Sequence, residues 1–179
     1  MSRLLHVKDL REAARTQTPQ QFCAQLGAFV LVQRPTGTVY QELAKLLRRG
    51  DTVAMAHELR LPQEILSMLQ AFENLLVLPL NTLEKKGELV VGRADDCDVV
   101  IHEPSVSSRH AMLKWKQESQ QCALIDLDSR NGTFLNARRL PARESYLADG
   151  DAISFGDAQF LFFRAEALQE QIKSFHGKS

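Results

Sequence analysis

Residues suited to chemistry are grouped in the second half of the sequence, so a catalytic site is the first possibility to test. His110 follows closely after Ser107 and Ser108. The surrounding sequence nevertheless has no Ser-His-carboxylate order, no paired-carboxylate motif and no P-loop. In the first half, His57 and Glu58 match the start of a zinc-protease helix, but position 61 is leucine where the second histidine is needed. These residues therefore favour binding over catalysis.

Four polar clusters fall between the expected strands of this half. In chain order they are Gly92-Arg93, Ser107-Ser108-Arg109-His110, Asp128-Ser129-Arg130-Asn131-Gly132-Thr133 with Asn136, and the run from Leu147 to Gly156. Each cluster alone is a weak signal, but their combination and order resemble the forkhead-associated (FHA) family. The resemblance covers roughly residues 75–165.

The resemblance implies both a fold and a ligand. Members of this family are sandwiches of about eleven strands, in which rigid sheets fix the loops that carry recognition. A phosphothreonine peptide is held on the loops at one end, and a small apolar pocket takes the threonine methyl group. We therefore expect an FHA-type β-sandwich that binds phosphothreonine.

By the same resemblance, Arg93 clamps the phosphate, Ser107 supplies neutral donors beside it, and Asn131 reads the peptide backbone. The planar fork of a guanidinium suits a phosphate, and an amide both donates and accepts, as an extended main chain requires. Further phosphopeptide contacts are expected from Ser108, Arg109 and Arg130. Structural support of the site is expected from Gly92, His110, Gly132, Thr133 and Asn136, with His110 joining the loops through side-chain hydrogen bonds.

Simpler interpretations of these residues remain open. Arg93 could be a surface arginine paired with Asp95 or Asp96. Asn131 and Gly132 form the dipeptide that most strongly favours a tight turn, so Asn131 could serve the turn as well as a ligand.

The other polar residues also have structural alternatives. Ser108 could be a solvated turn serine, and strand alternation could point Arg109 away from a ligand. Downstream, Arg138, Arg139 and Arg143 add positive charge, although runs of surface arginine are typical of a solvated face.

Composition limits the remaining possibilities. The chain of 179 residues carries 22 Lys plus Arg and 22 Asp plus Glu, so its net charge predicts no general attraction to nucleic acid or membranes. Three widely spaced cysteines without a CxxC pair argue against disulfides and structural zinc. Residues 1–10 have scattered charges instead of an apolar run. We expect a cytoplasmic protein with no metal and no cofactor.

The sequence divides by periodicity into a mainly helical N-terminal region at 1–73, the β-sandwich at 74–165 and a short polar tail at 166–179. This is an α+β organisation by halves. Strands are expected at 75–80, 89–92, 99–101, 111–116, 123–127, 152–155 and 160–163. Helices are expected at 39–49 and 62–72, and Thr18-Pro19-Gln20-Gln21 predicts a helix start with a capping box. Residues 29–32 could be a lone strand or an extended arm. The tail is expected to be a fraying helix.

These observations predict a non-catalytic adaptor that binds a phosphothreonine-containing protein, such as a Ser/Thr kinase or its substrate, with an oligomeric state that the sequence leaves open. The alternative is a phosphate-independent scaffold of the same fold, although Arg93, Ser107 and Asn131 together argue against it. A phosphorylated threonine of the N-terminal region could also be a ligand in cis. The candidates are Thr16, Thr18, Thr36 and Thr38.

Overall fold

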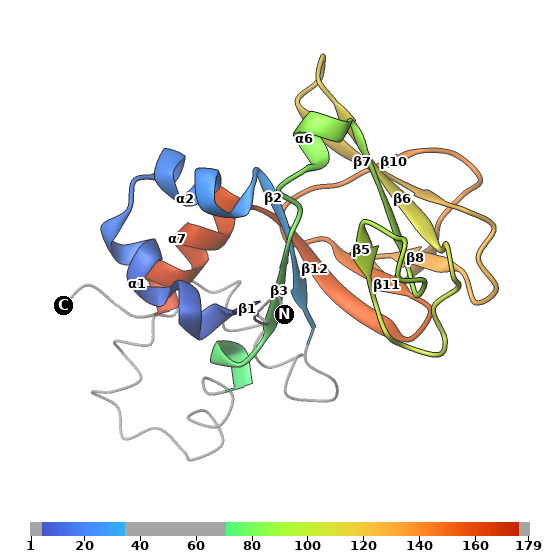
Figure 1. The fold of residues 1–179 in the computed structure, drawn as a ribbon, viewed down its shortest axis with the longest axis horizontal. Helices are drawn as coiled ribbons and strands as arrows, with labels where there is room; N and C mark the ends of the chain where they lie inside the picture. The colour runs from blue at the N-terminus through green and yellow to red at the C-terminus, as the bar shows by residue number, and fades with distance from the viewer. Residues whose placement is uncertain (1–4, 35–70, 176–179) are drawn as a thin grey trace.

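The computed structural model describes residues 5–34 and 71–175, and in this part of the chain two β-sheets face each other (Figure 1). The larger sheet has seven strands in the order β1-β3-β2-β12-β11-β8-β9. Its strands are β1 (Leu5–His6), β2 (Phe29–Gln33), β3 (Leu76–Pro79), β8 (Thr133–Leu135), β9 (Arg138–Arg139), β11 (Ala152–Phe155) and β12 (Ala158–Arg164). All of its neighbouring strands are antiparallel.

The smaller sheet has five strands in the order β10-β7-β6-β4-β5. They are β4 (Glu88–Gly92), β5 (Val99–Val100), β6 (Ala111–Lys116), β7 (Gln121–Asp126) and β10 (Ser145–Tyr146). Only the β4–β5 pair of this sheet is parallel, with Val91 opposite Val99. The single helical turn α6 (Leu83–Lys86) leads into β4.

The core between the sheets follows from strand alternation. Leu89 and Val91 of β4 are buried, whereas Glu88 is exposed and Val90 is half-buried. Ile153 and Phe155 approach from the other sheet and are also fully buried. Because successive side chains of a strand point to opposite faces, each sheet contributes every second residue to one shared core.

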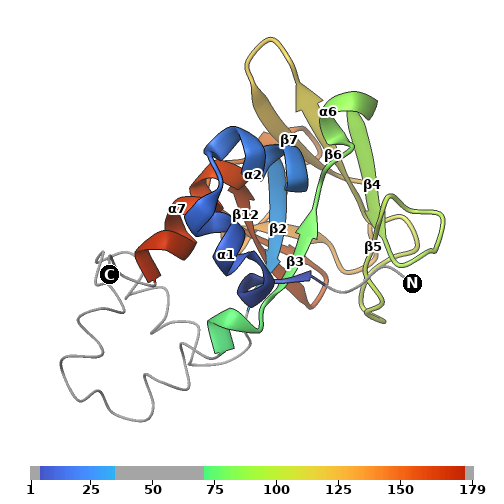
Figure 2. The same cartoon turned by 60° about the vertical axis from the view of Figure 1, so that its left-hand side comes forward.

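A layer of helices packs on the outer face of the seven-stranded sheet around β2, β3 and β12 (Figure 2). It consists of the 3₁₀ turn η1 (Val7–Leu10), α1 (Arg11–Thr16), α2 (Pro19–Leu26) and α7 (Ala165–Phe175). These helices enclose a second core with Val30, Val32 and Val77 of the sheet. The helices therefore cover the part of this face that β2, β3 and β12 form.

The start of α2 was predicted correctly. Thr18 is the N-cap, Pro19 is the first helical residue, and Thr18 Oγ1 accepts from Gln21 N at 3.3 Å. The Gln21 side chain in turn accepts from Thr18 N at 3.0 Å. The expected helices at 39–49 and 62–72 lie largely outside the described residues.

The ambiguous stretch at 29–32 is strand β2, and it lies in the middle of the larger sheet between β3 and β12. Phe29 and Leu31 belong to the core between the sheets, whereas Val30 and Val32 belong to the core under the helices. Burial of both faces removes the polar alternation that marks a half-buried strand, which explains the ambiguity.

The helix α7 is docked onto the sheet, in contrast to the fraying tail that we expected. Leu168 and Ile172, four residues apart, are buried in the second core. The fully buried Gln169 donates to the carbonyl oxygens of Ala14 at 3.1 Å and Gln17 at 2.9 Å. The division of the chain at residues 73 and 165 remains a proposal. Strand β2, which precedes residue 73, pairs with β12 of the sandwich, and α7, which begins at residue 165, packs in one core with the N-terminal helices.

Candidate functional site

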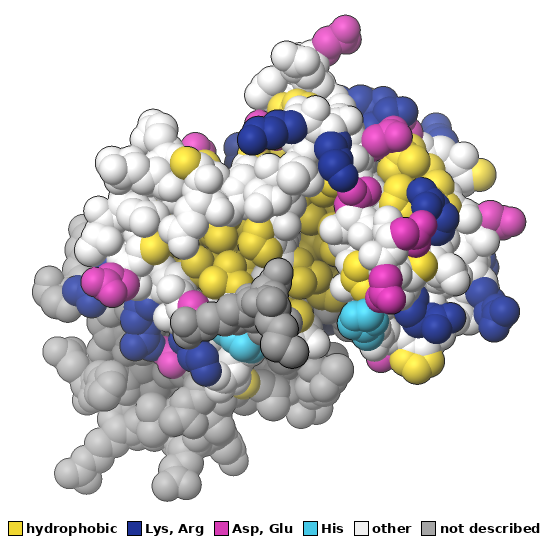
Figure 3. Space-filling model, in the orientation of Figure 1, with side chains coloured by type: hydrophobic (Ala, Val, Ile, Leu, Met, Phe, Trp, Pro, Cys, Tyr) yellow, Lys and Arg dark blue, Asp and Glu magenta, His cyan; other side chains and the backbone are white. Residues whose placement is uncertain are grey.

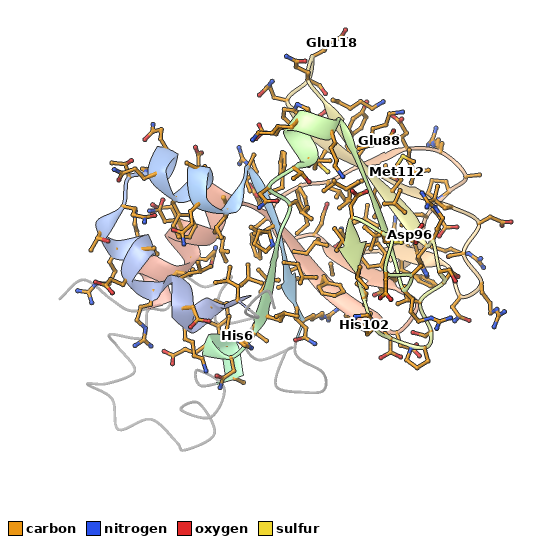
Figure 4. The ribbon with its side chains drawn as sticks, viewed as in Figure 1. His6, Glu88, Asp96, His102, Met112 and Glu118 are labelled. Atoms are coloured by element: carbon orange, nitrogen blue, oxygen red, sulfur yellow. The ribbon has the colours of Figure 1, made fainter. Side chains whose placement is uncertain are left out.

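Three loops meet at one end of the sandwich because of the strand pairing around Gly92. The β4–β5 loop (93–98), the β5–β6 loop (101–110) and the β7–β8 loop (127–132) all leave the sheets at this end. Figure 4 shows His102, from the second of these loops, at the opposite end of the sandwich from Glu118 in the β6–β7 turn. The predicted site residues from 92 to 132 are therefore brought to a common region.

His110 joins the second and third loops. Its side chain has no exposed surface, Nδ1 accepts from Ser107 N at 3.0 Å, and Nε2 lies 3.1 Å from Gly132 O. Since Nδ1 accepts an N–H, the proton must be on Nε2, which then donates to the Gly132 carbonyl. A neutral imidazole in this tautomer ties the two loops together.

Burial lowers the pKa of His110 from its ordinary value of 6.5, although the Gly132 hydrogen bond and the nearby Asp126 carboxylate oppose that shift. Protonation of Nδ1 would also remove the acceptor that Ser107 N uses. The folded protein therefore favours the neutral form.

We expect the free energy of unfolding to decrease as the pH falls below about 6.5. In that range the unfolded chain protonates this histidine before the folded chain does, so acid favours unfolding, and the loss stops below the folded-state pKa. Urea unfolding at a series of pH values measures it, with His110→Gln as a non-titrating comparison of similar hydrogen-bonding capacity. Equal pH slopes for the two proteins between about pH 7.5 and 5.5 would contradict the assignment.

Arg93 lies at the start of the first loop and is exposed. Its backbone N–H donates to Ser107 O at 3.0 Å and its Nε donates to Val106 O at 3.1 Å. Because Nε is used within the protein, the two terminal amino groups of the guanidinium remain for a ligand. Arg93 also borders an open depression of about 570 Å³ that Asp95, His102 and Pro104 line.

Ser107 and Asn131 connect the second and third loops next to Arg93. Ser107 Oγ accepts from Arg130 N at 3.0 Å, so its hydroxyl hydrogen is left to donate elsewhere. Asn131 Nδ2 donates to Ser105 O at 2.7 Å, while the residue itself is exposed. The structure therefore brings Arg93, Ser107, Arg130 and Asn131 together.

Ser108 and Arg109 are both exposed, and Arg109 has an acidic neighbour. Arg109 Nη1 lies 3.3 Å from Asp96 Oδ2, and both side chains are more than half exposed. An exposed pair of this kind contributes little to stability, so Arg109 could exchange this partner for a ligand. The structure thus pairs Asp96 with Arg109, whereas Arg93 is held by Val106.

Position 92 requires glycine because other parts of the protein pack closely against its backbone. A Cβ atom there would lie 2.2 Å from Ser108 O and 2.9 Å from Cys97 Sγ. Cys97 Sγ itself donates to Ser108 O at 3.1 Å. The bare backbone of Gly92 therefore lets the second loop pack directly against the end of β4.

The third loop is held by Asp126, a residue that the sequence motifs did not identify. Its carboxylate accepts from Ser129 N at 3.1 Å, Ser129 Oγ at 2.6 Å and Thr133 Oγ1 at 2.5 Å. Burial alone would raise the pKa of Asp126, but these hydrogen bonds together lower it by more, so the pKa is below its ordinary value. The sequence signal that could have identified Asp126 is the pair of hydroxyl residues three and seven positions after it.

Two further polar residues, the expected Asn136 and the unexpected Ser105, connect segments around the site. Asn136 donates from Nδ2 to Asp151 Oδ1 at 2.8 Å and accepts from Ala152 N at 2.9 Å. Ser105, which the motifs also missed, accepts from Asp157 N at 2.9 Å through Oγ and from Asn131 through its carbonyl. Asn136 therefore ties the β8–β9 turn to the start of β11, whereas Ser105 ties the second loop to the third loop and to the β11–β12 turn.

Among residues 5–34 and 71–175, no three His, Cys, Asp or Glu side chains are grouped so that they could hold a metal ion, and no helix is long and apolar enough to span a membrane. Cys23, Cys97 and Cys122 are free thiols. Lys and Arg are interspersed with Asp and Glu over the face in Figure 3, which therefore presents no large field of one sign.

The fold and the loop cluster define a β-sandwich binding module with its candidate site at one end. Residues 89–156 match the family model described as the FHA domain. The chain therefore belongs to the proteins that carry an FHA domain.

Several known proteins are similar to part of this chain. The chain is 38% identical over 90 residues to the DNA damage response protein kinase DUN1 of Saccharomyces cerevisiae, covering 47% of this chain and 18% of that one. It is 35% identical over 77 residues to the FHA domain-containing protein FhaA of Mycobacterium tuberculosis, covering 43% and 14% respectively. The matched part thus spans less than a fifth of these relatives. A solved structure described as an analysis of phosphothreonine-dependent FHA domain interactions is 34% identical, with a TM-score of 0.40, and 43% of this chain and 76% of that chain are covered.

Proposed function

We propose that this protein is a non-catalytic adaptor whose FHA domain binds a phosphothreonine peptide in Ser/Thr kinase signalling. The observation that carries the proposal is the link between Arg93 and Ser107. The Arg93 N–H donates to Ser107 O, Arg93 Nε donates to Val106 O, and Ser107 Oγ accepts from Arg130 N. These contacts support a site in which a guanidinium and a hydroxyl donor act together. A phosphate dianion needs charged and neutral donors in this kind of arrangement.

The surrounding residues support a peptide rather than a free phosphate as ligand. Asn131 is exposed next to these donors and is oriented by Ser105 O. Its amide oxygen faces no described hydrogen-bond donor and suits the N–H of an extended peptide. Ser108, Arg109 and Arg130 lie on the same loops and supply further contacts in this proposal.

The partner in this proposal is a phosphothreonine-containing protein, either a Ser/Thr kinase or its substrate, in the cytoplasm. The relatives support the link to kinases, since one of them is named as a DNA damage response protein kinase. Thr16 and Thr18 are poor ligands in cis because both lie in the helical layer, where Thr18 caps α2. Thr36 and Thr38 lie outside the described residues.

Calorimetric titration with a degenerate phosphothreonine peptide library, and with the same library unphosphorylated, tests the function. Binding of the phosphorylated library alone supports the proposal. Equal binding of both libraries, or binding of neither, would favour the phosphate-independent scaffold. The residue preferences of the bound fraction would then describe the partner.

We further expect at least a tenfold preference for phosphothreonine over phosphoserine in peptides that are otherwise identical. Phosphate and backbone contacts are the same for both, so only the γ-methyl group discriminates. Its burial contributes about 0.8 kcal/mol by area, and a well-shaped pocket raises the difference to roughly 1 to 3 kcal/mol. Calorimetry at fixed salt measures the ratio, and equal affinities would refute the methyl pocket while leaving the phosphate clamp intact.

A further inference from the structure

The hairpin that follows the third loop carries two arginines toward the candidate site. Strands β8 and β9 pair with Phe134 opposite Arg139 and Leu135 opposite Arg138. The turn between them is tight, since Asn136 and Ala137 have φ values of 51° and 66°. Strand β9 therefore runs back toward Gly132 and the loop that holds Asn131.

Arg139 lies directly on that loop. A Cβ atom added at Gly132 would lie 3.1 Å from Arg139 Nε and 3.3 Å from Arg139 Cζ. The guanidinium thus covers the bare backbone of the residue next to Asn131. Leu140 N donates to Thr133 O at 2.9 Å and fixes the strand in this position.

Neither arginine of the hairpin has a carboxylate partner among the described residues. Several other basic side chains do have one, including Lys116 with Glu144 and Arg164 with Asp149. Arg138 and Arg139 are both exposed. Within the described residues, their charges are therefore left available to an anionic group of a ligand.

A depression of about 490 Å³ lies beside these charges. Its lining combines the two guanidinium side chains with apolar residues and one amide, namely Leu135, Asn136, Arg138, Arg139, Leu140 and Pro141. Apolar and cationic groups around one depression fit a side chain that has a short aliphatic stem and an anionic end. The same Arg139 borders both this depression and Gly132.

We propose that Arg138 and Arg139 form a second anion subsite, which binds an acidic side chain flanking the phosphothreonine in the same peptide. This inference rests on the proposed function, because the peptide must first be held by the neighbouring loops. A carboxylate and a second phosphate share the required chemistry. The subsite makes the preferred ligand an acidic or doubly phosphorylated segment.

The test is a set of phosphothreonine peptides in which one glutamate replaces alanine at each position in turn, measured by calorimetry at low salt. One position should improve affinity about three- to fivefold, as expected for a partly exposed ion pair. A phosphoserine at that position should improve it further, which separates the two anion sources. A flat scan, with the parent peptide still bound, would overturn the subsite alone.

Charge reversal assigns the effect to Arg139. In Arg139→Glu the glutamate peptide should bind more weakly than the alanine peptide of the same variant, and the lysine peptide should bind more tightly than it. Arg143→Glu makes the same change of charge outside the depression and should keep the wild-type preference. Circular dichroism confirms folding, and Arg139→Gln provides a milder variant that should only abolish the preference. Equal behaviour of the 139 and 143 variants would overturn the assignment, and a wild-type protein that binds no phosphothreonine peptide would overturn the proposed function together with this inference.

Discussion

Replacing Arg93 with alanine is expected to remove measurable phosphopeptide binding while the protein stays folded. The side chain is exposed and its only described hydrogen bond is from Nε to Val106 O, so its loss costs the fold little. In the complex, the guanidinium would donate two charge-assisted hydrogen bonds to phosphate, and removing one partner of such a pair costs about 2 to 5 kcal/mol. Calorimetry and circular dichroism on one sample measure both effects.

Arg93→Lys is the control that separates charge from geometry. Lysine keeps the positive charge but lacks the planar fork, so binding should be weakened without being lost. Arg15→Ala, an exposed arginine of α1 in the helical layer, should bind like the wild type. Unchanged affinity in Arg93→Ala would show that the phosphate is held elsewhere.

His110→Ala should reduce both stability and binding. The substitution leaves Ser107 N–H and Gly132 C=O without their partners in a buried region, at about 1 to 3 kcal/mol for each group. A Tm lowered by roughly 5 to 10 °C follows for a chain of this size. Phosphopeptide affinity should fall as well, because the loop of Ser107 is no longer tied to that of Asn131.

The exposed His102 provides a matched control, since it lies in the same loop and makes no described hydrogen bond through its side chain. His102→Ala should leave the Tm unchanged. If His110→Ala lost binding with an unchanged Tm, the histidine would have to contact the ligand directly.

The strands with clear alternation were the ones that the sequence predicted best. The predicted strand at 111–116 coincides with β6, and those expected at 89–92 and 152–155 match β4 and β11 within one residue. In each, buried residues alternate with more exposed ones over at least part of the strand. The FHA resemblance was confirmed by the family match at residues 89–156. It could be predicted because its four clusters are short local motifs at strand ends.

Features that depend on long-range pairing were harder to predict. Strands β8, β9 and β10 have only two or three residues each, too few to show a period. The place of β2 between β3 and β12 joins segments far apart in sequence, which periodicity does not encode. Likewise, Ser105 supports the site through contacts with Asn131 and Asp157 that only the folded loops create.

The most direct test of the central claim is a nitrogen-15 NMR titration of the protein with one phosphothreonine peptide and its unphosphorylated twin. We predict saturable shifts of the backbone amides of Arg93, Ser107, Arg130 and Asn131 with the phosphorylated peptide only, and their absence in Arg93→Ala. The amides of α1, α2 and α7 should not move. Shifts that are the same without the phosphate, or that map to the helical layer, would contradict the claim that these three loops bind phosphothreonine.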